Sequence, residues 1–266
     1  MLPLYDENPV SRRPVVTWLI VAACIAAFLF WQPAPFTDTV EDTQFSLEWA
    51  AIPCEVLQGR PLSVDEVVAT YQLGDGEACG VGSPEPPFDA GKLVFGSLLV
   101  ATFLHAGLLH LLGNLLFLWV FGNNVEDRLG HVLFALFYLA GGVVASLAHV
   151  VVNPSSTVPL VGASGAIAAV MGAYLVWFPH ARVRTLVFIF VMDLRAVWVL
   201  GIWFLFQFFT DPNDGVAWMA HVGGFLFGMA VALVVRAAGG GRPDPVPPGY
   251  GYYGGWRPPR RPDGRY

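Results

Sequence analysis

The sequence contains few charged residues. Asp, Glu, Lys and Arg make up 13% of its 266 residues, about half the 25% or so that is typical of soluble domains. Lys92 is the only lysine. By contrast, 55% of the residues are hydrophobic and the mean hydropathy is +0.58. Because the apolar residues also gather in long runs, this composition indicates an integral membrane protein rather than a large soluble core.

Several other features are missing, and each absence excludes a class of function. The formal net charge is −6, so nothing in the composition suggests nucleic-acid binding. There is no CxxC motif or His/Cys cluster, so no metal site is predicted. No small-residue cleavage site follows the first apolar run, which we therefore expect to be retained as a membrane span.

Three cysteines are present. Cys24 lies in an apolar run and is expected to be an inert small hydrophobe. Cys54 and Cys79 share one long polar loop. We expect them to form a disulfide if that loop faces an oxidising compartment. The bond would close a loop of about 25 residues and stabilise it by about 3 kcal/mol.

A helix that crosses a bilayer needs about 20 mostly apolar residues. On this basis we predict an all-α membrane protein with six transmembrane helices, at about residues 15–31, 93–121, 132–152, 161–178, 194–209 and 216–235. Leu186–Val191 is apolar but is followed by Asp193 and Arg195, so it is predicted to lie near the interface. Residues 35–92 form an acidic polar loop, and residues 237–266 a flexible tail rich in Gly, Pro and Arg.

The distribution of arginine predicts the orientation. Six spans put both ends of the chain on one side of the membrane. Arginines occur in residues 1–14, between the second and third spans, between the fourth and fifth, and after the sixth. All these positions share one side, which is then cytoplasmic. The acidic loop lies on the opposite, extracytoplasmic side, which supports the predicted disulfide.

Three polar side chains fall in the second predicted span: His105, His110 and Asn114. His110 and Asn114 are four residues apart and share one helix face, whereas His105 sits further round. Polar groups at membrane depth often mark a functional site. Hydrogen bonds between helices would explain them equally well.

The fourth predicted span opens with Gly162-Ala163-Ser164-Gly165. Ser164 falls in the first helical turn, where unpaired N–H groups and the positive end of the helix dipole lie. Such donors can stabilise an oxyanion. The alternative is a small-residue packing site in which the serine acts as the N-cap.

The sixth predicted span contains His221, a residue type suited to general-base chemistry near neutral pH. Gly224 and Gly228 follow it as a GxxxG motif, and a second stripe of small residues begins at Ser164. Two such stripes let helix backbones approach closely, and close approach is what a pair of Ser164 and His221 would need, since Oγ and the imidazole must come within about 3 Å. Packing alone would also explain these stripes, and a lone intramembrane histidine can be structural.

With these motifs in this order, the sequence resembles the rhomboid family of intramembrane serine proteases, over roughly residues 93–235 plus the first span. The matching motifs are His105-Ala-Gly-Leu-Leu-His110-Leu-Leu-Gly-Asn114, Glu126-Asp-Arg-Leu-Gly, Gly162-Ala-Ser164-Gly165 and Ala220-His221-Val-Gly-Gly224.

The resemblance implies a six-helix rhomboid-like bundle and assigns roles to individual residues. Ser164 would attack the scissile carbonyl, and His221 would take its proton and later protonate the leaving amine. His110, Asn114 and the Ser164 N–H would form an oxyanion hole. The supporting residues would be His105, Glu126, Gly162, Gly165, Gly224 and Gly228.

The resemblance also implies partners and a location. The substrates would be transmembrane proteins, cut near the outer face of a bacterial inner membrane and in contact with its lipid, without a metal or cofactor. Two departures bear on the first loop and on how the base is positioned. Gly96-Ser97 replaces a Trp-Arg pair of many bacterial relatives, and Ala168 replaces a tyrosine that stacks on the base in others. The alternative functions are an inactive scaffold that binds transmembrane helices and a small transporter.

Overall fold

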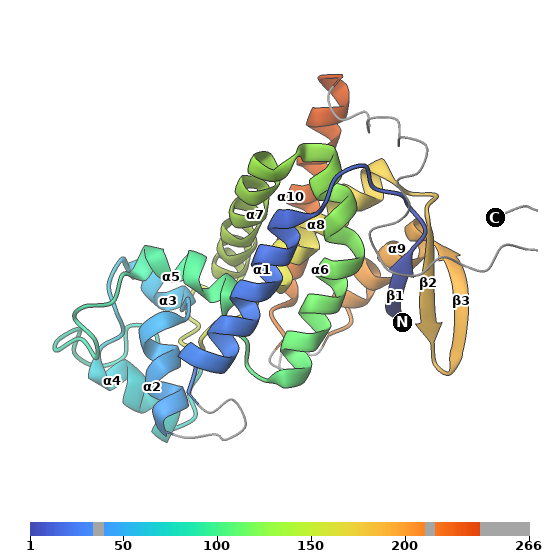
Figure 1. Ribbon diagram of the computed structural model, residues 1–266. Helices are drawn as coiled ribbons and strands as arrows, with labels where there is room; N and C mark the ends of the chain where they lie inside the picture. Colours follow the sequence, from blue (N-terminus) through green and yellow to red (C-terminus); the bar gives the residue numbers. More distant parts are fainter. Residues whose placement is uncertain (34–39, 211–215, 240–266) are drawn as a thin grey trace, which may run out of the picture.

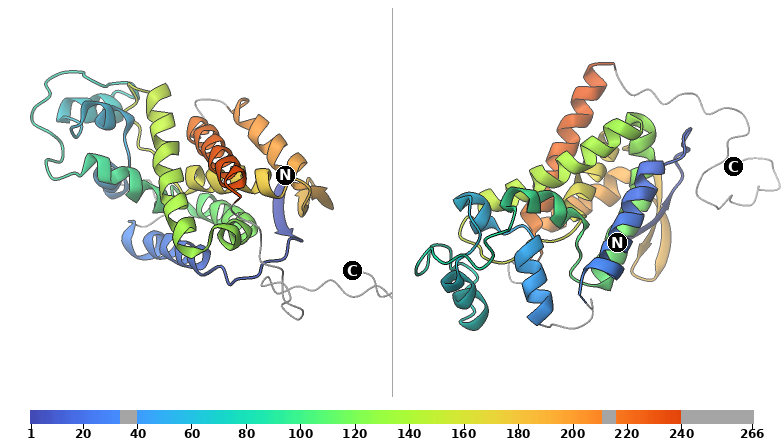
Figure 2. Two further views of the ribbon diagram at one scale, coloured as in Figure 1. Left: turned by 90° about the horizontal axis from the view of Figure 1, so that it is seen from above. Right: turned by 60° about the vertical axis from the view of Figure 1, so that its left-hand side comes forward.

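The long apolar runs form helices that pack side by side (Figures 1 and 2). The computed structural model describes residues 1–33, 40–210 and 216–239. The apolar helices are α1 (Val15–Ala26, extended by a π-helical turn Ala27–Trp31), α5 (Val94–Val100, extended by a 3-10 turn Ala101–Phe103), α6 (Leu108–Leu129), α7 (His131–Val152), α8 (Ser164–Trp177), α9 (Ala196–Gln207) and α10 (Trp218–Ala237).

Helix length separates these elements into two groups. Within the described residues, α6, α7 and α10 are long and apolar enough to cross a membrane, at 22, 22 and 20 residues. The segments 15–31, 94–103, 164–177 and 196–207 are apolar but shorter. The predicted count of six spans therefore remains a prediction. Of the predicted tail, residues 240–266 lie outside the described part of the chain.

The second predicted span, 93–121, is not one continuous helix. The helix breaks after Phe103, restarts at Leu108 and continues to Leu129. At the break the side chain of Gln32 takes over the backbone hydrogen bonding. Its amide nitrogen donates to the carbonyl of His105 at 2.8 Å, and its Oε1 accepts from the His105 N–H at 3.0 Å. Because these backbone groups have a partner outside the helix, the chain turns without leaving them unsatisfied.

Helix α8 is the centre of the bundle. Every residue from Gly165 to Tyr174 is buried, and α6, α7 and α10 pack around it (Figure 2). The backbones of α8 and α10 touch directly. A Cβ added to Gly224 or Gly228 would lie 2.1 or 1.9 Å from a carbonyl oxygen of α8. These two positions accept only glycine unless the helices move apart.

The fold is not entirely α-helical. A three-stranded antiparallel sheet is formed by β1 (Leu2–Asp6), β2 (Arg182–Val187) and β3 (Phe190–Arg195), in that order (Figure 1). The stretch 186–191, which was predicted to lie near the interface, forms the exposed end of the β2–β3 hairpin. Pairing of β1 with β2 places the N-terminus beside the connection between α8 and α9, so these two segments share one side of the bundle.

The N-terminal segment is also tied to α6 and α8 by buried carboxylates. Asp6 accepts hydrogen bonds from Tyr174 Oη at 2.7 Å and Asn124 Nδ2 at 2.8 Å. Burial raises the pKa of Asp6 to about 7, although these hydrogen bonds lower it. Glu126 caps α1 from outside the helix, because its two oxygens accept from the N–H groups of Val16 and Thr17 at 2.8 and 2.7 Å. These N–H groups have no intrahelical partner of their own.

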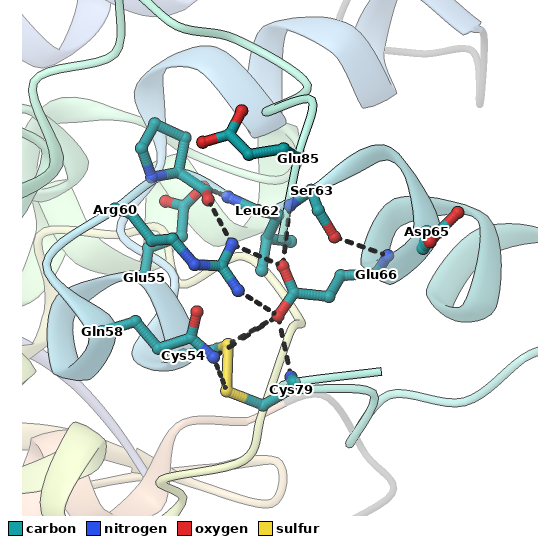
Figure 3. Close-up of polar contacts among 12 residues, drawn as sticks. Cys54, Glu55, Gln58, Arg60, Leu62, Ser63, Asp65, Glu66, Cys79 and Glu85 are labelled. Carbon is teal, nitrogen blue, oxygen red and sulfur yellow. Dashed lines mark hydrogen bonds and ion pairs between the residues drawn. A yellow bond between two sulfur atoms is a disulfide. The ribbon is translucent and has the colours of Figure 1, made fainter. Parts of the chain in front are cut away.

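The polar loop folds into a small helical unit beside the bundle, with α2 (Val40–Trp49), α3 (Pro53–Gln58) and α4 (Val64–Gln72) (Figure 1). Of the predicted loop 35–92, residues 35–39 lie outside the described part. A disulfide joins Cys54 to Cys79. Beside it, Glu66 accepts from Arg60 at 2.9 and 3.0 Å and from the Gly80 N–H at 2.8 Å (Figure 3).

Glu66 also closes a capping box with Ser63 at the start of α4. Burial alone would raise its pKa, but the hydrogen bonds from Arg60, Ser63 and Gly80 lower that pKa to about 2. A second carboxylate, Glu55, forms a buried ion pair with Lys92 at 2.5 Å. Glu55 and Glu66 are therefore both buried, and each is paired with a basic side chain of the loop.

This loop unit docks onto the segment that leads into α8. Ala51 and Leu160 exchange backbone hydrogen bonds at 3.3 and 2.7 Å. The Cys54 N–H donates to the carbonyl of Ser156 at 2.9 Å. The loop thereby fixes the approach to the N-terminus of α8.

Candidate active site

The turn before α8 requires a glycine at position 162. Gly162 has a φ of 131°, a conformation that side-chain-bearing residues rarely adopt. A Cβ there would also lie 2.8 Å from Cε1 of His110. The Gly162 N–H donates to the carbonyl of Ala101 at 2.9 Å. The turn places Ser164 as the first residue of α8 and packs Gly162 closely against His110 of α6.

Ser164 and His221 are in hydrogen-bond contact. Ser164 Oγ lies 2.8 Å from Nε2 of His221, which α10 carries. The close approach of the two helices makes this contact possible, since Gly224, one turn after His221, faces the carbonyl of Gly165. The small-residue stripes therefore lie at the interface between α8 and α10, as the sequence indicated.

The other ring nitrogen of His221 has a partner that the sequence did not reveal. Nδ1 lies 2.7 Å from Oε1 of Gln207, the last residue of α9. The indole of Trp203, one turn earlier on α9, lies beside the imidazole with ring centroids 5.7 Å apart. A buried glutamine at the end of an apolar span was the available signal, and only the tertiary contact shows what it faces.

His110 and Asn114 lie on α6 across from Ser164. Together they line a cavity of about 530 Å³ that reaches Ser164 and His221. Asn114 is buried, and its Nδ2 has no hydrogen-bond partner among the described residues. Nδ1 of His110 accepts from the Ala106 N–H at 3.4 Å. A buried amide donor without a partner beside a serine is the arrangement expected of a group that awaits a ligand oxygen.

The remaining predicted residues serve the framework. His105 is buried in the connection before α6, where Nδ1 lies 3.2 Å from the carbonyl of Phe103. It contacts His110 edge to face at 5.3 Å and does not line the cavity. Glu126 lies at the other end of α6, where it caps α1. Gly165 and Gly228 lie where neighbouring helices touch.

One cluster of ligand-type atoms occurs elsewhere in the described residues, formed by Cys54, Glu66 and Cys79. Both sulfurs are engaged in the disulfide (Figure 3). Since metal binding needs a free thiolate, this cluster offers a metal only the carboxylate, and we assign it a structural role.

The cavity is built to surround a serine with a base and hydrogen-bond donors. The hydroxyl has an imidazole nitrogen at 2.8 Å, the first N–H groups of α8 are free of intrahelical partners, and the Asn114 amide is open. Proton removal from the hydroxyl and stabilisation of an oxyanion are the two requirements of acyl transfer by a serine nucleophile. The arrangement is therefore chemically competent for that reaction.

Comparisons with known proteins agree with the family resemblance seen in the sequence. The Rhomboid domain family model matches residues 94–238. The chain is 31% identical over 150 residues to the mitochondrial presenilin-associated rhomboid-like protein of Mus musculus, covering 53% of this chain and 38% of that protein. It is 33% identical over 144 residues to rhomboid protease GluP of Bacillus subtilis, covering 53% and 27%.

A further match is the rhomboid-related protein 2 of Mus musculus, with 31% identity over 144 residues, covering 49% of this chain and 45% of that protein. The chain thus spans less than half the length of each of these relatives. The family match covers more than half of this chain and includes α6, α8 and α10, which carry the serine, the histidines and the open amide. The chain belongs to the rhomboid family of membrane proteins, whose relatives include proteases.

Proposed function

We propose that this protein is an intramembrane serine endopeptidase that cuts transmembrane segments of other membrane proteins with Ser164 and His221. The observation that carries the proposal is the 2.8 Å contact between Ser164 Oγ and His221 Nε2. This distance is within the reach that proton transfer from a nucleophile to its base requires.

The reaction follows from the positions of these groups. Ser164 Oγ attacks the scissile carbonyl while His221 Nε2 takes the hydroxyl proton. The oxyanion accepts hydrogen bonds from Asn114 Nδ2, from the His110 ring and from the Ser164 N–H. His221 then gives its proton to the leaving amine, and water attacks the acyl-enzyme by the same steps in reverse.

The length of α8 supports a site below the membrane surface. Its 14 residues span about 21 Å, whereas the hydrocarbon core is about 30 Å thick. At the far end, the Arg128 guanidinium lies over the Trp177 ring at 5.1 Å, an aromatic and arginine pair typical of an interface. With that end at one interface, Ser164 lies several ångströms short of the other.

We further propose that the end of the bundle with the arginines faces the cytoplasm, in a bacterial inner membrane. The sheet supports this orientation, because it places the N-terminal strand beside the arginines of β2, on one side. The loop unit with the disulfide then faces the oxidising side. A mitochondrial relative shows that the family also occurs in organelles.

The test uses the purified full chain in detergent. It is incubated with a model single-span substrate and, separately, with a fluorophosphonate probe that labels activated serines. We expect cleavage and labelling by the wild type, and neither by Ser164→Ala or His221→Ala. A Ser164→Ala variant that still cuts would refute the assignment. A wild type that binds the substrate but neither cuts nor labels would identify an inactive scaffold instead.

A further inference from the structure

Gln207 is a buried polar residue at the end of an otherwise apolar helix. Its side chain makes two hydrogen bonds at once. Oε1 lies 2.7 Å from His221 Nδ1, and Nε2 donates to the carbonyl of Trp203 at 2.9 Å. Only 7% of the residue is exposed. Burying an amide costs free energy unless both its ends are satisfied, and here both are.

The second of these bonds decides which end of the amide faces the histidine. The Trp203 carbonyl can only accept, so the NH2 group of Gln207 must point toward it. The carbonyl oxygen of Gln207 therefore faces His221. Since that oxygen is also only an acceptor, Nδ1 of His221 must carry the hydrogen.

The tautomer follows from this chain of donors and acceptors. A neutral imidazole with its hydrogen on Nδ1 has a lone pair on Nε2. Nε2 is the atom that faces Ser164 Oγ at 2.8 Å. Gln207 thus stabilises the one neutral form of His221 that can accept the serine proton.

We infer that Gln207 is a positioning residue that holds the tautomer and ring orientation of His221 for the transfer of the Ser164 proton. The inference rests on the proposed protease function. The Gln207 oxygen remains an acceptor after His221 takes the proton, so the bond persists through the step. Its role resembles that of the orienting carboxylate in a soluble serine-protease triad, without the negative charge.

Trp203 completes the support from α9. Its ring packs beside the imidazole at 5.7 Å and beside Phe225 of α10 at 6.0 Å. Ala168, at the α8 position where some rhomboid relatives carry a stacking tyrosine, has no ring to offer. In this chain α9 supplies both the aromatic neighbour and the hydrogen bond that orient the base.

The test compares two substitutions at position 207. Gln207→Met keeps the length of the side chain and removes the acceptor, whereas Gln207→Glu keeps an oxygen for Nδ1. We expect Gln207→Met to lower kcat by about 10- to 100-fold, the range for a misplaced catalytic group, with KM changed less than about twofold. The rate of fluorophosphonate labelling, which needs no helical substrate, should fall in parallel. Gln207→Glu should recover most of both rates.

A purely structural role predicts a different pattern. In that case each variant would lose rate only in step with a fall in its melting temperature, and a Gln207→Met variant that melts at the wild-type temperature would label at the wild-type rate. Leu205→Ala serves as the matched control, because Leu205 is on the same helix with its side chain exposed. We expect it to label at the wild-type rate.

Two outcomes separate this inference from the function on which it rests. Cleavage by Ser164→Ala would remove the proposed protease mechanism altogether. An inactive Ser164→Ala variant together with Gln207→Met at wild-type rates would leave the mechanism intact and overturn the role of Gln207. Equal losses in the methionine and glutamate variants would also overturn it.

Discussion

The contact between α8 and α10 makes a quantitative prediction for Gly224→Ala. An added Cβ would lie 2.1 Å from the carbonyl oxygen of Gly165, while real Cβ contacts do not fall below 3.0 Å. Both atoms belong to the backbone or are fixed to it, so no side-chain rotation can relieve the clash. The two helices must separate by about 0.9 Å at this level.

The separation acts on the proposed catalytic pair, because Gly165 adjoins Ser164 and Gly224 is one turn from His221. A shift of that size would lengthen the 2.8 Å contact between Ser164 Oγ and His221 Nε2 to about 3.7 Å, beyond hydrogen-bond range. A misplacement of about 1 Å costs on the order of 100-fold in rate. The overpacking should also destabilise the fold by about 1–3 kcal/mol.

The assay measures kcat/KM on a single-span substrate, the rate of fluorophosphonate labelling and the melting temperature in the same detergent. Gly201→Ala is the matched control, since Gly201 is a glycine of α9 with nothing within 4 Å of its added Cβ. It should keep full activity and gain slightly in stability, by up to about 1 kcal/mol. Wild-type kcat/KM in a folded Gly224→Ala variant would refute the reasoning.

Three further predictions concern other parts of the molecule. Asn114→Ala should lower kcat by about 100- to 1000-fold with little change in KM, because it removes an oxyanion donor; an unchanged kcat would exclude that role. Cys79→Ser should destabilise the loop unit by about 3 kcal/mol, and reductant should change the gel migration of the wild type but not of this variant. Glu66 has a folded-state pKa of about 2 against an ordinary value of 4.5, so its contribution to stability is complete above about pH 4.5 and is lost as the pH falls toward 2. The melting temperature should therefore fall more steeply from pH 6 to pH 2 in the wild type than in Glu66→Gln. Parallel falls in the two proteins would contradict the stabilising role assigned to the Glu66 carboxylate.

The bundle was predictable where the information is local. Long apolar runs indicate membrane helices because each run must satisfy its backbone hydrogen bonds within itself. Small residues at four-residue spacing share one helix face, so they indicate that a second helix backbone can approach closely there. Gly224 and Gly228 accordingly lie against α8, and Ser164 and His221 meet across that interface.

Predictions failed where a distant segment decides the local structure. The break before α6 depends on Gln32, which lies 73 residues away from His105 and takes its backbone hydrogen bonds. The β-sheet depends on pairing between Leu2–Asp6 and Arg182–Val187. Such non-local pairing leaves no periodic signal in the sequence, so the strands were not predicted, whereas the placement of 186–191 near the membrane interface stays a prediction.

The sequence by itself indicated a membrane environment, the central helices and the candidate serine, histidines and asparagine of the site, because each depends on residue type and spacing along one helix. Only the tertiary structure decided that Gln207 of α9 meets the imidazole of His221 and that Glu126 caps α1 from a distance. A hydrogen bond between helices depends on their relative depth and rotation, which many residues set together. No single motif encodes those two quantities.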